Sequence, residues 1–299
     1  AAAASPGARL RLAQFNVLAD GLSGKDQKLG GFTESPVGAL DFRYRKDRLI
    51  EELLRHGDPP DVIAMEEVDH YHDWFEPVLA ELGYEGTFLS KPRSACRNSL
   101  DPSLSDGCAL FWRRDSVSLV ELETMNYDAA GKDGLPTGGK DNQVAILARL
   151  RPRGGAPVTV AVTHLVAKKS ADGEQSRSRQ ILQLLDRLME RGQGRGLPCI
   201  VAADLNAAPT RGTTANYDAL AYPAALQHEL GLRSAYAEAL GAEPAYTTWK
   251  KRGSHEAMHT IDYIFVSPGI EVVRVLAPPE PEDVDSTRFP GWRYPSDHV

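Results

Sequence analysis

The sequence predicts an α/β protein with two packed, mostly antiparallel sheets and helices outside them. Short apolar runs alternate with segments of helical periodicity along all 299 residues. Several strand-like runs follow one another without a helix between them, as over residues 108–121 and 143–163, which favours antiparallel sheets over a doubly wound parallel sheet. No internal repeat or low-complexity linker is visible. We therefore expect a flexible lead-in over residues 1–8 and a single domain over residues 9–299.

Strands are predicted where short apolar runs are bounded by turn residues. These runs are Leu10–Asn16, Asp61–Glu66, Gly86–Leu89, Cys108–Arg113, Val117–Glu121, Gln143–Leu150, Val158–Thr163, Cys199–Ala203 and Ile261–Val266. Helices are predicted where apolar residues recur three and four positions apart, over about Arg45–His56, Tyr71–Leu82, Ser176–Arg191 and Tyr217–Leu230. Three long stretches read as irregular: Ser90–Asp106, Asn126–Asn142 and Ala277–Pro295. Each borders a polar segment, so we expect them to form the walls of a cleft.

The composition excludes several classes of protein. Apolar residues make up 42% of the chain and charged residues 25%, which is ordinary for a globular protein, and no apolar run approaches the roughly 18 residues that cross a bilayer. Three cysteines without a CxxC pair argue against a disulfide framework or a zinc site, so we expect an intracellular protein of the cytoplasm or an organelle. The net charge of −7 favours a small substrate over a long nucleic acid. The oligomeric state stays open.

Polar residues gather in six short segments, each placed where a strand should end. The segments read QFNVLAD, AMEEVDHY, SDGCALF, VTHLVAK and AADLNAAPT, followed by the pair HTIDYIF and YPSDHV. Their polar residues are Asn16, Glu67, Asp106, His164, Asp204, Asn206, Asp262, Asp297 and His298. This set suits a hard metal ion, a phosphate group and a water nucleophile. Each residue alone has an ordinary structural explanation, and the prediction depends on their joint placement.

Glu67 follows an apolar strand, and a carboxylate there suits Mg²⁺ or Mn²⁺, which prefer oxygen ligands. Alternatively, Glu67 is a surface or capping residue.

Asp204 and Asn206 alternate after the strand ending at Ala203, so both side chains should lie on one face. We expect Asp204 to hold or deprotonate a water and Asn206 to donate to a phosphate oxygen. The alternative is a plain Asx turn leading into Pro209.

Asp262 lies within an apolar strand, where an acid needs a partner. His298 is the natural candidate, because a buried carboxylate can orient an imidazole and keep it protonated beside a phosphate. Asp297 would then face the metal. The alternative is a structural salt bridge. Asn16 and His164 end two further strands and could contact the phosphate, although residues of these types are also common at strand ends.

Together the blocks resemble the endonuclease/exonuclease/phosphatase superfamily, the deoxyribonuclease-I-like fold, over about residues 9–299. Within it, EVDHYHDWFEPVLAELGYEGTF from Glu67 and AYTTWKKRGSHEAMHTIDYIF from Ala245 resemble the nocturnin family in the branch that includes the deadenylases. SDGCALF from Ser105 and NQVAI from Asn142 support the same assignment. The resemblance implies a four-layer α/β sandwich and a catalytic Mg²⁺ or Mn²⁺ held chiefly by Glu67. It implies further active-site roles for Asn16, His164, Asp204, Asn206, Asp262 and His298.

The resemblance also implies a substrate, removal of the 2′-phosphate of NADP or NADPH, with 3′-to-5′ exoribonuclease action on poly(A) as the alternative. A catalytically inactive relative that only binds nucleotides or a protein is a third reading, but Glu67, Asp204 and His298 are all present. We assign Asn16, Lys91, Asn142 and Lys168 to substrate binding, with Lys91 and Lys168 on either side of the cleft. Two features depart from the family. The segment after the THL triplet reads VAK where basic residues are usual, and the chain ends at Val299 where a last core strand is expected.

Overall fold

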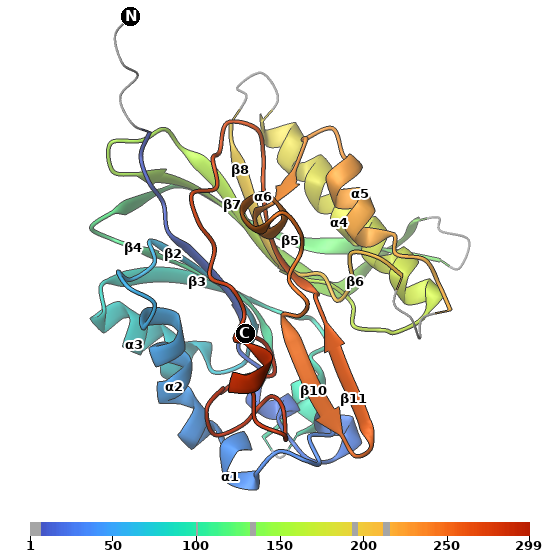
Figure 1. Cartoon of the computed structure of the whole chain (residues 1–299). Coiled ribbons are helices and arrows are strands. Elements are labelled where there is room, and N and C mark those ends of the chain that lie inside the picture. Colours follow the sequence, from blue (N-terminus) through green and yellow to red (C-terminus); the bar gives the residue numbers. More distant parts are fainter. Residues whose placement is uncertain (1–6, 100, 132–135, 193–196, 212–215) are drawn as a thin grey trace, which may run out of the picture.

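Two β-sheets pack face to face, and helices cover their outer faces (Figure 1). The computed structural model describes residues 7–99, 101–131, 136–192, 197–211 and 216–299. The α/β fold with two packed, mostly antiparallel sheets flanked by helices is therefore confirmed. In each sheet one neighbouring pair of strands is parallel and the other pairs are antiparallel.

The smaller sheet has the strand order β1-β2-β4-β3. Its strands are β1 (Leu12–Asn16), β2 (Val62–Val68), β4 (Gly107–Arg113) and β3 (Tyr84–Ser90). Because β1 and β2 are parallel, their carboxyl ends lie at the same edge, and Asn16 pairs with Glu66 there. A register shift between Met65 and Val68 distorts β2 at this edge, where Glu67 is located.

The larger sheet has the order β5-β6-β7-β8-β12-β9. Its strands are β5 (Val117–Ala130), β6 (Pro136–Pro152), β7 (Val158–His164), β8 (Cys199–Asp204), β12 (Asp262–Val266) and β9 (Arg233–Ser234). β7 and β8 are parallel, and His164 pairs with Asp204 at their shared end. β12 runs antiparallel to β8 and pairs Asp262 with the same Asp204. The register thus brings these three side chains to one edge of the sheet.

Alternation along the strands separates three apolar layers. Between the sheets, Ala64 and Leu110 of the smaller sheet pack with Ile146 and Val160 of the larger one. Outside the smaller sheet lie α2 (Phe42–Leu54) and α3 (Glu76–Glu81), and outside the larger sheet lie α4 (Ala171–Gly192) and α5 (Ala221–Gln227). α4 packs on its sheet through the helically spaced Ile181, Leu184, Leu185 and Leu188. Two shorter helices complete the set, α1 (Val37–Leu40) and α6 (Ala235–Leu240).

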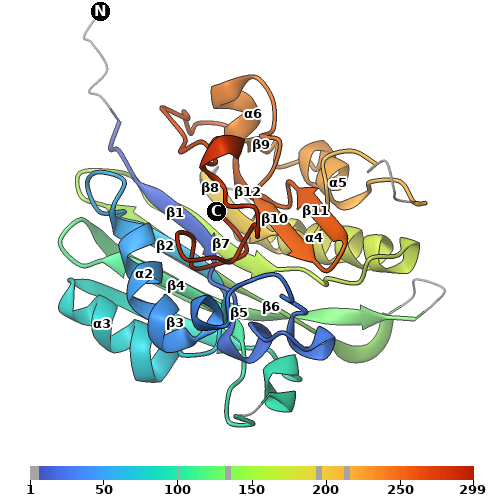
Figure 2. The same cartoon turned by 60° about the horizontal axis from the view of Figure 1, so that its bottom comes forward.

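A two-stranded hairpin, β10 (Thr248–Arg252) and β11 (His255–His259), projects from the sheets beside the carboxyl end of the chain (Figure 2). The last residues are fixed to it: His298 forms a β-bridge with Thr248, and the Val299 N–H donates to the Thr247 carbonyl at 2.9 Å. On the other side, the buried Arg45 donates to the Pro295 carbonyl at 3.2 Å. The final segment is therefore held over the edge where the strands of both sheets end.

The structure differs from the sequence-based expectation in several elements. Residues 126–142 were expected to be irregular, but the described part continues the β5–β6 ladder, with Asp128 opposite Lys140. The hairpin β10–β11 is polar and was not predicted. The helix expected over Tyr217–Leu230 is shorter, because α5 covers only Ala221–Gln227. Among the described residues, no helix is long and apolar enough to cross a membrane.

Candidate active site

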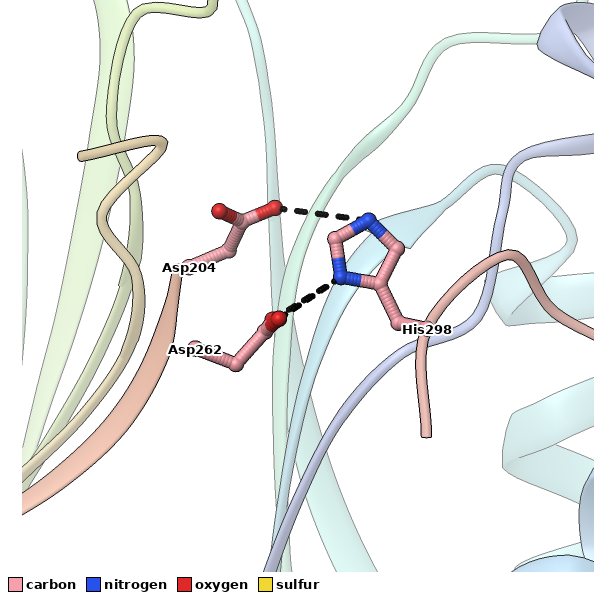
Figure 3. A group of neighbouring side chains, drawn as sticks. All are labelled: Asp204, Asp262 and His298. Atoms are coloured by element: carbon pink, nitrogen blue, oxygen red, sulfur yellow. Dashed lines mark hydrogen bonds and ion pairs between the residues drawn. The ribbon is translucent and has the colours of Figure 1, made fainter. Parts of the chain in front are cut away.

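Asp262 and His298 form a buried pair at the edge where the strands end (Figure 3). Nδ1 of His298 lies 2.8 and 3.0 Å from the two carboxylate oxygens of Asp262. Its other nitrogen, Nε2, is 3.9 Å from both Asp204 and Asp297 and 3.5 Å from Nζ of Lys250. Although burial opposes the charged form, Asp262 and Asp297 raise the pKa of His298 to about 9. The imidazole is therefore protonated at neutral pH.

Asp204 lies between two histidines and an amide. Its Oδ2 accepts a hydrogen bond from Nδ2 of Asn16 at 2.9 Å and is 3.5 Å from Nε2 of His164. Its Oδ1 accepts from the backbone N–H of Asn206 at 2.9 Å, so the predicted Asx turn is also present. Burial and the neighbouring Asp262 raise the pKa of Asp204 to about 7. A carboxylate with that pKa can exchange a proton near neutral pH.

The smaller sheet contributes Asn16 and Glu67 from the opposite side. Nδ2 of Asn16 also donates to Oε1 of Glu67 at 3.2 Å, and Oε2 of Glu67 accepts from the Ala19 N–H at 3.3 Å. Glu67 has a backbone φ of 56°, in the left-handed region that residues other than glycine rarely adopt. Leu18 and Asn206, both near the site, have φ of 55° and 51°. Such conformations gather at functional sites because the surrounding structure must hold them in place.

Asp297 is buried and pairs with Lys250 through Oδ2. Although burial opposes ionisation, Lys250 and His298 lower the pKa of Asp297 to about 2. Its other oxygen, Oδ1, is buried, accepts no hydrogen bond from the described residues and lies 3.9 Å from Nε2 of His298. A buried, ionised oxygen that accepts no hydrogen bond is costly unless another group or an ion stabilises it.

His164 and Lys91 form the wall on the β7 side. Nε2 of His164 is 2.8 Å from Nδ2 of Asn206, and its Nδ1 is 3.5 Å from Nζ of Lys91. Burial and the charge of Lys91 lower the pKa of His164 well below its usual range, so this imidazole is neutral. Lys91 is buried and pairs with Asp106 at 2.5 Å. The glycine after Asp106 is required, because a side chain at Gly107 would collide with the Leu89 carbonyl of β3.

Two predicted substrate-binding residues lie differently from the expectation. Lys168 does not point into the site: its side chain is 61% exposed and lies 3.5 Å from Asp172. Asn142 is occupied with the backbone of Arg93, because its Oδ1 accepts from the Arg93 N–H at 2.7 Å and its Nδ2 donates to the Arg93 carbonyl at 3.0 Å. Asn142 therefore braces the loop that carries Lys91. The other predicted site residues are brought together.

Three contributors to the site were not singled out from the sequence. Lys250 lies beside Asp297 and His298, Thr247 donates from Oγ1 to Asp262 at 2.6 Å, and Gln14 donates from Nε2 to Asp262 at 3.3 Å. Thr247 and Lys250 belong to the stretch AYTTWKK, which carried the family resemblance, so a signal for them was present. Nothing in the sequence alone distinguished Gln14 from other strand residues.

A group of positive charges extends from Lys250 along the hairpin face. Lys250 and Arg252 alternate on β10 and so lie on one face, where their cross-strand partners Ala257 and His255 also lie. Burial and the charges of Lys250 and Arg252 lower the pKa of Lys169. Burial and the charges of Lys169 and Lys250 likewise lower the pKa of His259. These shifts show that the cations are close enough to repel one another, and such a group suits an anionic ligand.

The donor atoms fit a hard divalent cation. Among the described residues, the carboxylate oxygens of Glu67 accept from the Asn16 amide and the Ala19 N–H, and Oδ1 of Asp297 accepts no hydrogen bond. The three cysteines are buried, and burial raises the pKa of each thiol, so thiolate ligands are unavailable. Asp204, Asp262 and His298 also have ligand atoms within 4.8 Å of one another. A protonated imidazole bound to Asp262 cannot coordinate a metal, so Glu67 is the better ligand.

A comparison with protein families identifies the family to which the chain belongs. The model of the Endonuclease/Exonuclease/phosphatase family matches residues 13–298, so the chain belongs to this family. Enzymes of this family generally depend on a divalent metal. Within the family the chain is similar to Nocturnin. Nocturnin of Xenopus laevis is 38% identical over 295 residues, which cover 97% of this chain and 70% of that protein.

Two further comparisons agree with this assignment. A solved structure of the human Nocturnin catalytic domain with a bound sulfate anion superposes with a TM-score of 0.71 at 33% identity, covering 98% of this chain and 91% of that one. The chain spans 63% of the full human Nocturnin. The CCR4-Not complex 3′-5′-exoribonuclease subunit Ccr4 of Neurospora crassa is 24% identical over 369 residues, 97% of this chain and 44% of that protein. The chain is thus a Nocturnin-like hydrolase of the endonuclease/exonuclease/phosphatase family.

Proposed function

We propose that this protein is a Mg²⁺- or Mn²⁺-dependent phosphatase that removes the 2′-phosphate of NADP and NADPH. The observation that carries the proposal is that a protonated imidazole, His298, lies 3.9 Å from a carboxylate of pKa about 7, Asp204. Carboxylate ligands for a cation and the ammonium group of Lys250 lie beside this pair. Phosphoryl transfer depends mainly on positioning and on stabilising negative charge, and this site provides groups for both.

Glu67 and Oδ1 of Asp297 would hold the cation. When bound, the cation supplies Lewis-acid stabilisation of the charge that develops on phosphoryl and leaving oxygens. Asn16 links Glu67 to Asp204, at 3.2 and 2.9 Å, so the metal-binding and water-binding sides of the site are tied to each other. The unusual backbone of Glu67 then has a reason, because it directs the carboxylate toward this amide.

Asp204 is suited to position a water and accept its proton. Its pKa of about 7 leaves a useful fraction ionised at neutral pH while keeping it basic enough to take a proton. Asn206 and the neutral His164 lie beside it and can donate to phosphate oxygens without adding charge to the site. His298, held by Asp262, donates from Nε2 to an oxygen that gains negative charge.

The distribution of cations supports a small polyanionic substrate. Lys250, Arg252 and Lys169 gather near the site, while the whole chain carries a net charge of −7. A dinucleotide with a 2′-phosphate has three phosphate groups within a short span, which a local group of cations can bind. A long polynucleotide usually needs a basic track over several phosphates. Lys91, whose charge is already matched by Asp106, would contact the phosphate beside His164.

The alternative is 3′-to-5′ hydrolysis of poly(A), which the Ccr4 relative favours by its name. One assay separates the two. The protein is incubated with Mg²⁺ and, in parallel, NADPH, NADP, poly(A) RNA and a generic phosphodiester, and the products are scored for phosphate and AMP. We expect phosphate from NADP and NADPH. Release of AMP from poly(A) with no phosphate from either dinucleotide would favour the exoribonuclease.

A further inference from the structure

β1 places two amides on the face that lies between the sheets. Gln14 and Asn16 are two residues apart and therefore point to the same side of the strand. Leu12, at the same spacing, packs in the layer between the sheets, whereas Phe15 packs on the opposite side, against α2. The two amides thus enter the junction between the sheets next to the active site.

The two amides make the same kind of contact. Gln14 makes it two residues further from the end of β1 than Asn16 does. Asn16 donates from one nitrogen to Glu67 of the smaller sheet and to Asp204 of the larger sheet, at 3.2 and 2.9 Å. Gln14 donates from one nitrogen to Glu66 and to Asp262, at 2.9 and 3.3 Å. An amide NH₂ has two hydrogens, so each can serve one carboxylate on either side. Each amide therefore joins one carboxylate of each sheet.

The carboxylate of Asp262 is fixed at both oxygens. Oδ2 accepts from the Thr247 hydroxyl at 2.6 Å, and Oδ1 accepts from Gln14 at 3.3 Å, while both oxygens face Nδ1 of His298. Without Gln14, the Thr247 hydroxyl would be the one donor among the described residues, apart from His298 itself, that limits rotation of the carboxylate about its Cβ–Cγ bond. The plane of Asp262 decides where its hydrogen bond holds the imidazole.

We infer that Gln14 is a positioning residue for the reaction: with Glu66 behind it, Gln14 holds Asp262 in the orientation that aims His298 at the substrate. Glu66 is fully buried and bonded to the Gln14 amide, so it fixes the amide from the side away from the site. The inference rests on the proposed function, because it concerns how that site is aligned. It gives β1 a second role beside that of Asn16, and this role needs no contact with the substrate.

The test replaces Gln14 by a side chain of similar size that cannot donate a hydrogen bond. Gln14→Met should lower kcat about 10-fold, the order expected when a hydrogen bond to a charged group is lost, and leave KM within about twofold. Leu12→Met, on the same face of the same strand, is the matched control and should leave kcat unchanged. In an Asp262→Asn background, Gln14→Met should cost less than about threefold, because the two residues act as a unit. Gln14→Asn, which keeps the amide on a shorter side chain, is a second variant should Gln14→Met fail to fold.

A second readout does not depend on any substrate. The proton on Nδ1 of His298, held by Asp262, should give a low-field ¹H NMR resonance that Asp262→Asn removes. We expect Gln14→Met to shift or broaden it, and Leu12→Met to leave it unchanged. An unshifted resonance in Gln14→Met, or an equal loss of kcat with and without Asp262, would overturn the inference. If wild-type protein with Mg²⁺ hydrolysed neither NADPH nor poly(A), the proposed function would fail, and the resonance would still decide the role of Gln14.

Discussion

Asp204 and Asp262 are direct partners across β8 and β12, yet their surroundings suit them to different roles. Asp262 accepts from Thr247, Gln14 and His298. Asp204 receives the Asn16 amide and a backbone N–H, and the nearby Asp262 raises its pKa together with burial. These surroundings suit Asp262 to orient an imidazole and Asp204 to exchange a proton. Two acids with different surroundings and different roles are a common arrangement in acid–base catalysis.

The pH dependence follows from these two groups. Asp204 must be ionised to accept a proton, so activity should fall as pH drops through about 7, the raised pKa of Asp204. His298 must be protonated to donate, so activity should fall as pH rises through about 9, the raised pKa of His298. The profile of kcat/KM against pH should be bell-shaped between these limits. A flat profile from pH 5 to 10, measured with the cation saturating, would contradict these assignments.

Single and double variants test whether Asp262 and His298 act as a unit, because their effects on kcat should then not multiply. Asp262→Asn should reduce kcat about 10²-fold or more, the size expected when a catalytic imidazole loses its orienting carboxylate. Adding His298→Ala to that variant should cost little more, since the two residues act together. The quantities to compare are the kcat values of both single variants and the double variant. Losses that multiply would show that the residues work independently.

We propose that Glu67 is the main residue behind the dependence on a divalent cation. Glu67→Ala should lower turnover at least about 100-fold, because a bound metal contributes several kcal/mol of charge stabilisation. EDTA should have the same effect on the wild-type protein, and added Mg²⁺ or Mn²⁺ should reverse it. Thermal unfolding of the variant, followed by circular dichroism, serves as the control for folding. Full activity of Glu67→Ala in the presence of chelator would remove Glu67 from the mechanism.

At the scale of elements, the hairpin β10–β11 brings Lys250 to the site. Lys250→Ala should lower kcat/KM for NADPH about 10- to 100-fold, because a charged hydrogen-bond donor beside the phosphate site is lost. The control is Lys168→Ala, whose exposed side chain pairs with Asp172 and should matter little. Steady-state kinetics on both variants gives the comparison. Equal losses in the two variants would mean that the hairpin has no special part in binding.

The elements that the sequence predicted are those with a buried apolar face. β2, β4, β7 and β8 are almost wholly buried, and α4 shows a clear stripe of apolar residues. The hairpin has mostly polar side chains, so it lacks that signal. The outer part of β5–β6 is likewise exposed and rich in glycine and charge, and its pairing comes from the backbone and from contacts such as Lys140 with Asp128. Neither leaves a pattern that spacing alone can detect.

At the scale of the molecule, the site exists because two sheets meet. The smaller sheet supplies Asn16 and Glu67, the larger supplies Asp204 and Asp262, and the last residues supply His298. For this reason we propose that residues 9–299 fold as one domain. Residue types at strand ends were enough to predict most of the side chains that the fold brings together at this edge. The side chains that join the sheets, such as Gln14, could not be predicted, because their partners lie 52 and 248 residues away along the chain.

In the proposed reaction, a water activated at Asp204 attacks the 2′-phosphate of NADP(H). The most direct test incubates the protein with NADPH and Mg²⁺ in water enriched in ¹⁸O and follows the products by ³¹P NMR and mass spectrometry. We expect NADH and an equal amount of inorganic phosphate that carries solvent ¹⁸O, because the P–O bond breaks at phosphorus. Unlabelled phosphate with ¹⁸O in the nucleotide, or no phosphate from NADPH while poly(A) releases AMP, would contradict it.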